Sequence, residues 1–161
     1  MAKAASPVPA GFHTMTPQLV LDDAAAAIDW YKRAFGAEEV SRSLGPDGKI
    51  MHAELKIGDS RVMMNDAMMG AKGAKSRGGS PVSFWVYVAD ADALFTRAVN
   101  AGATVQMPLD NQFWGDRAGA VADPEGISWW IATRAEDLST PEIQERFQAF
   151  MKQAAAPAGQ P

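Results

Sequence analysis

Residues 19–40 read LVLDDAAAAIDWYKRAFGAEEV, and residues 82–107 read VSFWVYVADADALFTRAVNAGATVQM. Both stretches follow one order: a strand, an Asp-led helix, a Gly-Ala pair that begins at Gly36 or Gly102, and a second strand. A repeat this short cannot bury its own apolar face, so we expect the two copies to pack together. A cavity between two half-sheets is then expected, and small ligands bind in such cavities.

Each copy extends into a module of four strands and one helix. In the first copy we expect a helix over residues 24–35 and strands over residues 14–21, 38–44, 50–57 and 61–65. Asp22 and Asp23 supply the N-cap of the helix, and Gly36 is suited to end it. Turn signals separate the later strands, so the order is βαβββ.

The second copy predicts the same order. We expect a helix over residues 90–101 and strands over residues 82–88, 104–108, 119–122 and 127–132. Residues 113–119 are expected to form a loop or a hairpin, and Asp-Pro-Glu-Gly at 123–126 a tight turn. A third helix is expected to begin at Ser139 or Thr140 and to reach about residue 151, where it covers a sheet or a partner subunit.

The predicted fold class is α+β, with tandem βαβββ modules that form a cupped mixed sheet around a cavity. The chain divides into a flexible N-terminal lead (1–11), a first module (12–67), a mobile linker (68–79), a second module (80–134), a C-terminal helix (135–152) and a tail (153–161).

Composition excludes several classes of function. The formal net charge of −4 argues against a nucleic-acid partner or an anionic membrane surface. The absence of cysteine excludes disulfides, zinc-thiolate sites and cysteine nucleophiles. No run of about 20 apolar residues is present to span a membrane, and the first residues lack the apolar stretch of a signal peptide. We therefore expect a cytoplasmic protein.

Tandem βαβββ units with these motifs resemble the vicinal oxygen chelate superfamily, the fold of glyoxalase I, bleomycin-resistance proteins and extradiol dioxygenases. The matching segments are residues 22–31, the Gly-Ala pairs and the turn at 123–126. Within that superfamily the chain looks most like an uncharacterised bacterial group of glyoxalase-like proteins, through residues 51–54, 58–60, 79–83, 113–117 and 131–138. The resemblance covers about residues 12–150.

The resemblance implies four metal-ligand positions, one on each of four strands. They fall on Thr16, Met64, Ser83 and Trp130. Metal-dependent members use His and Glu at these positions, whereas Thr and Ser are poor ligands, Met is soft and Trp cannot ligate. A shift by one residue to Asn65 does not restore the set. We therefore expect no metal and no cofactor.

His52 and Glu54 are the candidate catalytic residues. They lie two apart on an expected strand, so they face the same side. In the cavity they would serve in hydrogen bonding or acid–base chemistry, or hold a metal in an arrangement unlike the family's. Alternatively they pair with each other or with an arginine, or face water. His13, at the N-terminal edge, is expected to be solvated.

Aromatic residues gather in the second module: Phe84, Trp85, Tyr87, Phe113, Trp114, Trp129 and Trp130. On the first strand of this module, Ser83, Trp85 and Tyr87 share one face. By the resemblance that face lines the cavity, and so does Trp130. Aromatic walls suit planar or cationic ligands. The alternative is that the indoles only fill the space of a lost metal and substrate.

The loop at residues 113–117 offers two further interpretations. Arg117 could clamp an anionic ligand that Asp116 orients, or the two could form a structural pair that pins the loop. Met63 and Met64 face opposite sides of their strand, so at most one fills the core.

The expected ligand-binding residues are Thr16, Gln18, His52, Glu54, Met64, Ser83, Trp85, Tyr87, Trp114, Arg117 and Trp130. The predicted function is metal-independent binding of a small aromatic or cationic molecule. The bleomycin-resistance branch implies a homodimer with its sites between subunits. Two alternatives remain: a metal-dependent lyase, isomerase or dioxygenase of the superfamily, and an interaction module whose cavity is filled by its own side chains. The sequence does not decide whether the protein is an enzyme.

Overall fold

The computed structural model describes residues 6–155. Its elements are β1 (Gln18–Leu21), α1 (Ala24–Phe35), β2 (Glu38–Leu44), β3 (Ile50–Ile57), β4 (Ser60–Asp66), the short 3₁₀ helix η1 (Lys75–Arg77), β5 (Ser83–Tyr87), α2 (Ala91–Asn100), β6 (Thr104–Asn111), β7 (Asp116–Ala122), β8 (Ser128–Arg134) and α3 (Thr140–Ala155). They form two βαβββ modules, which confirms the predicted α+β fold.

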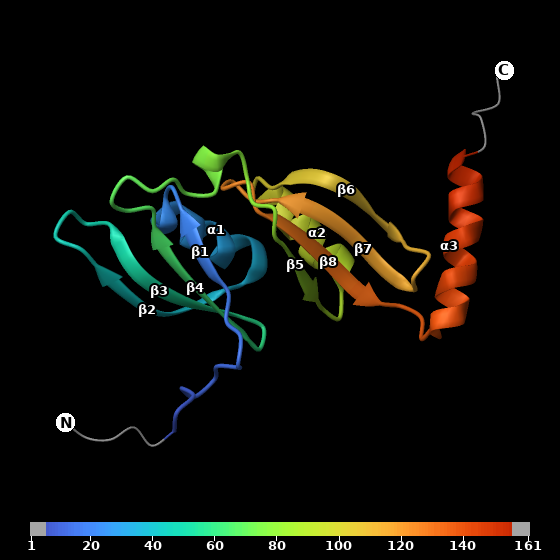
Figure 1. Cartoon of the computed structure of the whole chain (residues 1–161), viewed down its shortest axis with the longest axis horizontal. Helices are drawn as coiled ribbons and strands as arrows, with labels where there is room; N and C mark the ends of the chain where they lie inside the picture. The colour runs from blue at the N-terminus through green and yellow to red at the C-terminus, as the bar shows by residue number, and fades with distance from the viewer. Residues whose placement is uncertain (1–5, 156–161) are drawn as a thin grey trace.

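Each module contains one four-stranded mixed sheet. The strand orders are β1-β4-β3-β2 and β5-β8-β7-β6. In both sheets the first strand pairs parallel with the last, and the other pairs are antiparallel. Figure 1 shows the two modules side by side along the long axis of the molecule, with α3 at the far end of the second. The repeat in the sequence therefore corresponds to two modules with the same strand order and the same pattern of strand pairing.

Three strands differ from their predicted bounds by at least three residues. β6 continues to Asn111 instead of ending at residue 108. β1 begins at Gln18 rather than at residue 14, because Pro17 has no N–H to donate and contributes only its carbonyl, which accepts from Met63 N. β7 begins at Asp116, within the segment expected to be a loop or hairpin. A turn closed by Gly115, at φ +97°, sets this earlier start.

Residues 68–79, expected to be a mobile linker, are tied to the first module. The backbone N–H of Ala74 donates to Val20 O, and that of Ser76 donates to the Asp22 carboxylate. A side chain at Gly73 would clash with the backbone of Leu21 and Asp22, so only glycine fits this approach. The linker thus covers part of the outer edge of β1.

α3 extends farther than expected, to Ala155, and it packs on the protein at few points. Phe113, in the turn between β6 and β7, contacts Phe147 and Phe150 of this helix. The Arg146 guanidinium forms an ion pair with Glu136 at 2.7 Å. No helix within residues 6–155 is long and apolar enough to cross a membrane.

The two modules meet through their helices. The indole of Trp30 on α1 donates to Ala101 O at the end of α2, at 3.0 Å. Tyr31 and Phe35 of α1 contact the ring of Trp129 from β8, with centroids 5.5 and 5.0 Å apart. Because the helices occupy the junction, each sheet keeps one face packed on a helix and one face open.

A buried carboxylate, that of Asp123, joins this junction to the second tight turn. Its Oδ2 accepts from Tyr31 OH (2.6 Å) and from Trp129 Nε1 (2.9 Å). Its Oδ1 accepts from the backbone N–H groups of Glu125 and Ile127, both at 2.9 Å. One side chain thereby connects α1 of the first module with β8 of the second.

The same turn also touches the start of α1 and the linker. The Glu125 carboxylate accepts from the backbone N–H of Asp22 at 2.7 Å. Gly126, at φ +80°, lies against Gly79 so closely that a Cβ on it would stand 3.0 Å from Gly79 Cα. Residues 123–126 therefore fix the position of the first module relative to the second.

We predict that replacing Tyr31 with Phe lowers the free energy of unfolding by about 1.5–3 kcal/mol, because it removes one donor from a buried charge. Urea unfolding followed by circular dichroism measures the loss. Ser60→Ala is the control, since its hydroxyl also donates to a carboxylate, but the acceptor, Asp59, is exposed. The control should lose less than about 1 kcal/mol, and equal losses would contradict the role given to Asp123.

Candidate functional site

The open face of the second sheet carries the aromatic residues. Strand alternation places Ser83, Trp85 and Tyr87 of β5 on this face, and the register of β5 on β8 places Trp130 beside Trp85. The adjacent Trp129 points the other way and is buried against α1. The shared face predicted for Trp85, Tyr87 and Trp130 is thus confirmed.

The rings of this face form a continuous row. Trp85 and Trp130 are stacked, with centroids 4.7 Å apart and planes 3° from parallel. Tyr87 also stacks on Trp85, with centroids 6.0 Å apart, and Trp114 meets Trp85 and Trp130 edge-on at 6.2 and 6.3 Å. Ala120 lies opposite Trp130 in the ladder, and its small side chain leaves room for the indoles.

A buried carboxylate lies at one end of the aromatic row. Asp116 is only 6% exposed. Its Oδ2 accepts from Tyr87 OH at 2.9 Å and from Trp114 Nε1 at 3.0 Å. Asp116 is the first residue of β7, directly after the turn at Gly115, so this turn sets both the carboxylate and the indole of Trp114 in place.

These contacts change the acidity of Tyr87. Partial burial of the phenol, and then its hydrogen bond to the Asp116 carboxylate, raise the pKa of Tyr87 above its ordinary value of 10.0. The phenol therefore stays protonated at neutral pH and acts as a donor.

A hollow of about 430 Å³ opens beside these groups. It is lined by Tyr87, Trp114, Asp116, Arg134, Leu138 and Ile143. Leu138 precedes α3 and Ile143 belongs to it, so the C-terminal segment supplies an apolar wall. This hollow lies on the open face of the second sheet and combines aromatic, carboxylate and guanidinium groups.

The open face of the first sheet is polar. His52 and Glu54 share it, as predicted, and His52 Nε2 lies 3.3 Å from Glu54 Oε1. Arg61 of β4 approaches the same carboxylate, with Nη1 4.0 Å from Glu54 Oε2, and its guanidinium lies over the ring of Phe12. Gln18 donates to Asn65 at 2.7 Å on this face. These contacts match the expected pairing of His52 and Glu54 with each other and with an arginine.

The face assigned to Met64 was wrong. Met64 pairs with Leu19 and Ala53, is fully buried, and packs between the sheet and α1. Its neighbour Met63 occupies the open face beside Gln18 and Glu54. The expected position was shifted by one residue in β4, and such a shift moves every side chain of a strand to the other face.

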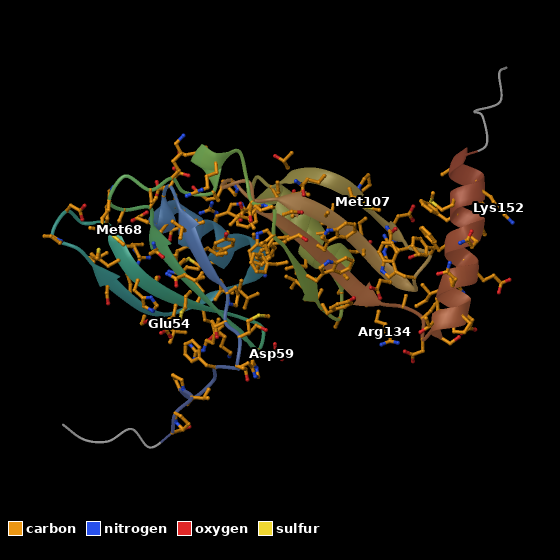
Figure 2. All side chains as sticks on the ribbon, viewed as in Figure 1. Glu54, Asp59, Met68, Met107, Arg134 and Lys152 are labelled. Atoms are coloured by element: carbon orange, nitrogen blue, oxygen red, sulfur yellow. The ribbon has the colours of Figure 1, made fainter. Side chains whose placement is uncertain are left out.

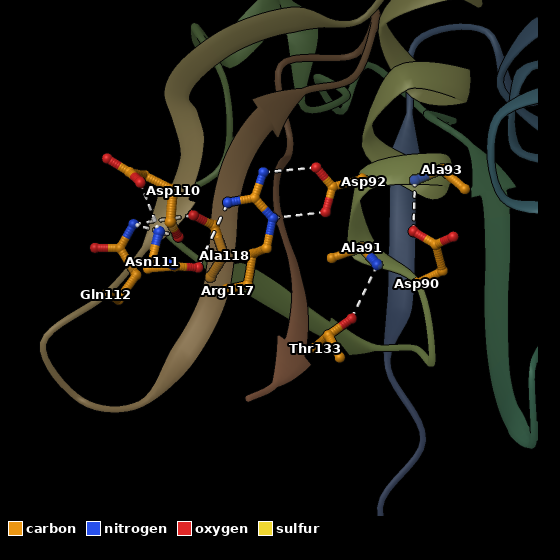
Figure 3. A network of polar contacts seen from close by, with 10 residues as sticks. All are labelled: Asp90, Ala91, Asp92, Ala93, Asp110, Asn111, Gln112, Arg117, Ala118 and Thr133. Atoms are coloured by element: carbon orange, nitrogen blue, oxygen red, sulfur yellow. Dashed lines mark hydrogen bonds and ion pairs between the residues drawn. The ribbon is translucent and has the colours of Figure 1, made fainter. Parts of the chain in front are cut away.

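Arg117 also lies on the helix side of its sheet, not on the aromatic face. Its guanidinium forms two parallel hydrogen bonds with the Asp92 carboxylate at the start of α2, both at 2.6 Å (Figure 3). Asp116 points to the opposite face, so the structural pair expected between Asp116 and Arg117 does not form. Arg117 therefore braces α2 against β7.

Two further expected site residues lie at the beginnings of strands. Thr16 precedes β1 and is half-buried, and Ser83 is exposed at the start of β5 opposite Ser128. His13 is exposed, as predicted for a solvated histidine.

The expected site residues therefore separate into two groups. Gln18, His52 and Glu54 belong to the first sheet, while Trp85 and the other aromatic residues belong to the second. Figure 2 shows Glu54 in the first module and Arg134 near the base of α3, toward the other end of the molecule. Within residues 6–155 no hydrogen bond or ring contact joins the two groups. A single chain thus presents two half-sites.

The donor atoms on these faces do not suit the metal of the family. No group of three or more His, Cys, Asp or Glu residues within residues 6–155 is arranged to hold an ion. His52 and Glu54 offer two donors on one sheet. On the other sheet Trp130, at a position where the family resemblance implies a ligand, has no lone pair to give.

Sequence reasoning missed the part of the site around Asp116. It considered this residue only as the partner of Arg117, and it did not include Arg134, Leu138 or Ile143. The one available signal was the position of Asp116 two residues after Trp114, the residue that donates to it.

Comparison with known proteins places this geometry in a family. The model of the glyoxalase/bleomycin resistance protein/dioxygenase superfamily matches residues 12–131. An uncharacterised protein of Mycobacterium tuberculosis (strain H37Rv) is 48% identical over 135 residues, which are 81% of this chain and 79% of that protein.

Two solved structures are similar in fold and sequence. TioX from Micromonospora sp. ML1 is 31% identical, with a TM-score of 0.61 over 79% of this chain and 100% of that chain. An Arabidopsis thaliana gene product is 32% identical, with a TM-score of 0.61 over 78% of this chain and 99% of that one.

The two tyrosines of the chain allow a direct test of the Asp116 contacts. In the Tyr31→Phe variant only Tyr87 remains, and we predict that its phenol ionises above pH 10.0. Adding Asp116→Asn should bring the pKa closer to 10.0, because it removes the carboxylate charge. Tyrosinate absorbance during alkaline titration measures both values.

The raised pKa of Tyr87 also determines how the stability of the fold changes with pH. The protonated phenol of Tyr87 stabilises the fold fully below pH 10.0, and this contribution disappears as the pH rises through the folded-state pKa. An unchanged titration in the double variant would show that Asp116 does not act on Tyr87.

Proposed function

The chain belongs to the glyoxalase/bleomycin resistance protein/dioxygenase superfamily, and we propose that it binds a small aromatic or cationic molecule on the aromatic face of its second module, without a metal. The observation that carries this proposal is the row formed by Trp85, Trp130, Tyr87 and Trp114 on an open sheet face. Large rings held parallel on an accessible surface suit a ligand that is planar or positively charged.

The exposure of these rings supports a binding role over simple core filling. Trp85 is 43% exposed and Tyr87 is 60% exposed, although both rings are stacked within the aromatic row on β5, the edge strand of the sheet. A contiguous aromatic surface of this kind marks a ligand or protein interaction site. The rings that do fill the core, Trp30 and Trp129, lie on the other side of the sheets.

The proposed independence from metal rests on the chemistry of the side chains. Trp130 stands on β8 where the resemblance implies a carboxylate ligand, and its indole is part of the aromatic stack. The site therefore has aromatic surface in place of an electron-pair donor. The presence of an indole where a metal ligand is implied favours binding of an organic molecule over Lewis-acid chemistry.

We further propose that two chains assemble, with the polar sheet face of one opposite the aromatic sheet face of the other. Each chain alone has two separate half-sites. The polar half contains a guanidinium atom, Arg61 Nη1, that is buried without a hydrogen-bond partner. A homodimer in the cytoplasm, as expected from the sequence, would complete both halves of the site at once.

One observation favours a second candidate function. His52, Glu54 and Arg61 form a line of contacts on the first sheet, in which the carboxylate lies between an imidazole and a guanidinium. Such a group is suited to proton transfer. A metal-independent enzyme of the superfamily is therefore the alternative, and loss of a measured activity in His52→Ala would support it.

We predict that planar aromatic or cationic compounds raise the melting temperature of the protein and quench its tryptophan fluorescence. Trp85→Ala should weaken binding about tenfold or more, because an aromatic pair contributes roughly 0.5–1.5 kcal/mol beyond the area it buries. Fluorescence titration of the intact chain measures the change.

Val40→Ala is the matched control, since Val40 is 46% exposed on the outer strand of the other sheet. Its affinity should equal that of the unchanged protein. If no compound of either class shifts the melting temperature, the binding proposal loses its support.

Metal content gives a separate test. Protein purified without chelator is expected to contain far less than one equivalent of nickel, zinc, iron or manganese by elemental analysis. One equivalent per chain, lost in a His52→Ala and Glu54→Ala double variant, would contradict metal-independent binding.

A further inference from the structure

We infer that Asp116, Tyr87 and Trp114 form a subsite for an organic ammonium group. This inference rests on the proposed binding function. It narrows the expected ligands from aromatic or cationic molecules to molecules that carry a quaternary ammonium group or a protonated amine. The subsite lies in the hollow between the second sheet and the start of α3.

The charge of Asp116 has no cationic partner. Its two hydrogen-bond donors, the phenol of Tyr87 and the indole of Trp114, are both neutral. Within residues 6–155 Asp116 forms no ion pair, although it is 6% exposed. Buried charges are normally paired, because removing an ion from water is costly. A ligand cation would supply the missing partner.

The walls of the hollow favour an organic cation. The rings of Tyr87 and Trp114 flank the carboxylate, and Trp85 lies beside both. The negative face of an aromatic ring attracts an ammonium group, most strongly when the ammonium is alkylated and weakly hydrated. A single carboxylate among rings lacks the several oxygen ligands that a metal ion requires.

The nearest arginine does not take this role. Arg134 pairs with Asp116 across the β7–β8 ladder and lines the same hollow, but its Nε bonds to Asp137 at 2.9 Å. The Arg134 guanidinium is thus directed toward Asp137, and the Asp116 carboxylate keeps no ion pair within residues 6–155. A positively charged ligand is therefore the complement.

The hollow is closed on one side by residues beyond the 12–131 segment that matches the family model. Leu138 and Ile143 line it, and the backbone N–H groups of Ala135 and Glu136 both donate to Gly115 O, beside Trp114. This contact positions the turn that carries Trp114 and Asp116. The subsite thus depends on this chain's C-terminal segment as well as on the second sheet.

Two probes of equal shape separate charge from size. Choline and its neutral isostere 3,3-dimethylbutan-1-ol are titrated into the intact chain by calorimetry. Choline should bind at least about tenfold more tightly, because only the cation gains the carboxylate and the ring faces. Equal affinity, or no binding by choline, would overturn the ammonium subsite without any variant.

Asp116→Asn should then reduce choline affinity about tenfold and leave the isostere unchanged. Asp59→Asn, an identical change of charge in an exposed turn of the first module, is the control and should retain full affinity. Circular dichroism checks that both variants fold. Choline binding that survives Asp116→Asn would place the cation elsewhere and overturn the inference.

The outcomes also separate this inference from the proposed function. If planar neutral aromatics bind in a manner sensitive to Trp85→Ala while choline does not bind, the binding function stands and the ammonium subsite fails. If neither neutral aromatics nor cations bind, both fail. Tighter binding of choline than of its isostere, lost in Asp116→Asn, supports both.

Discussion

The arrangement of the two modules depends on the carboxylate of Asp123. It is buried, and its oxygens accept hydrogen bonds from Tyr31, from Trp129 and from two backbone N–H groups of its own turn. A buried charge with four donors is stabilised where an unpaired one would be costly. Because the donors come from α1 and β8, the satisfied charge also specifies how the modules join, and it does so on the helix side of both sheets.

Because side chains alternate along a strand, two adjacent residues of β8 have different roles. One stabilises the fold, and the other belongs to the proposed binding face. Trp129 points toward the helices and donates to Asp123, while Trp130 points to the open face and stacks on Trp85. The same separation holds at Asp116 and Arg117, where the carboxylate serves the open face and the guanidinium braces α2. Neighbouring residues can therefore change on one face with little effect on the other, which lets one fold carry different ligands.

The sequence was sufficient for the modules, the bounds of α1 and α2, and the aromatic face, because each follows from local periodicity. It was insufficient for Met64 and Arg117, whose faces depend on register: one residue of shift in β4, and the turn before β7, reverse the side chains. The subsite at Asp116 could not be predicted, since Leu138 and Ile143 reach it only through tertiary packing of a segment that follows the second module. Nor did the repeat reveal that the helices, rather than the sheet faces, form the junction.

That junction has a consequence for ligand binding. With the helices between the modules, the polar face around Glu54 and the aromatic face around Trp85 stay open in one chain. Exposed rings and a poorly paired guanidinium at Arg61 each carry a solvation cost, and each face has the chemistry that the other lacks. In the proposed dimer the two faces meet, so a ligand between them would contact rings and the Asp116 carboxylate from one chain and His52, Glu54 and Arg61 from the other. Assembly and ligand binding would then be coupled, because each orders the same surfaces.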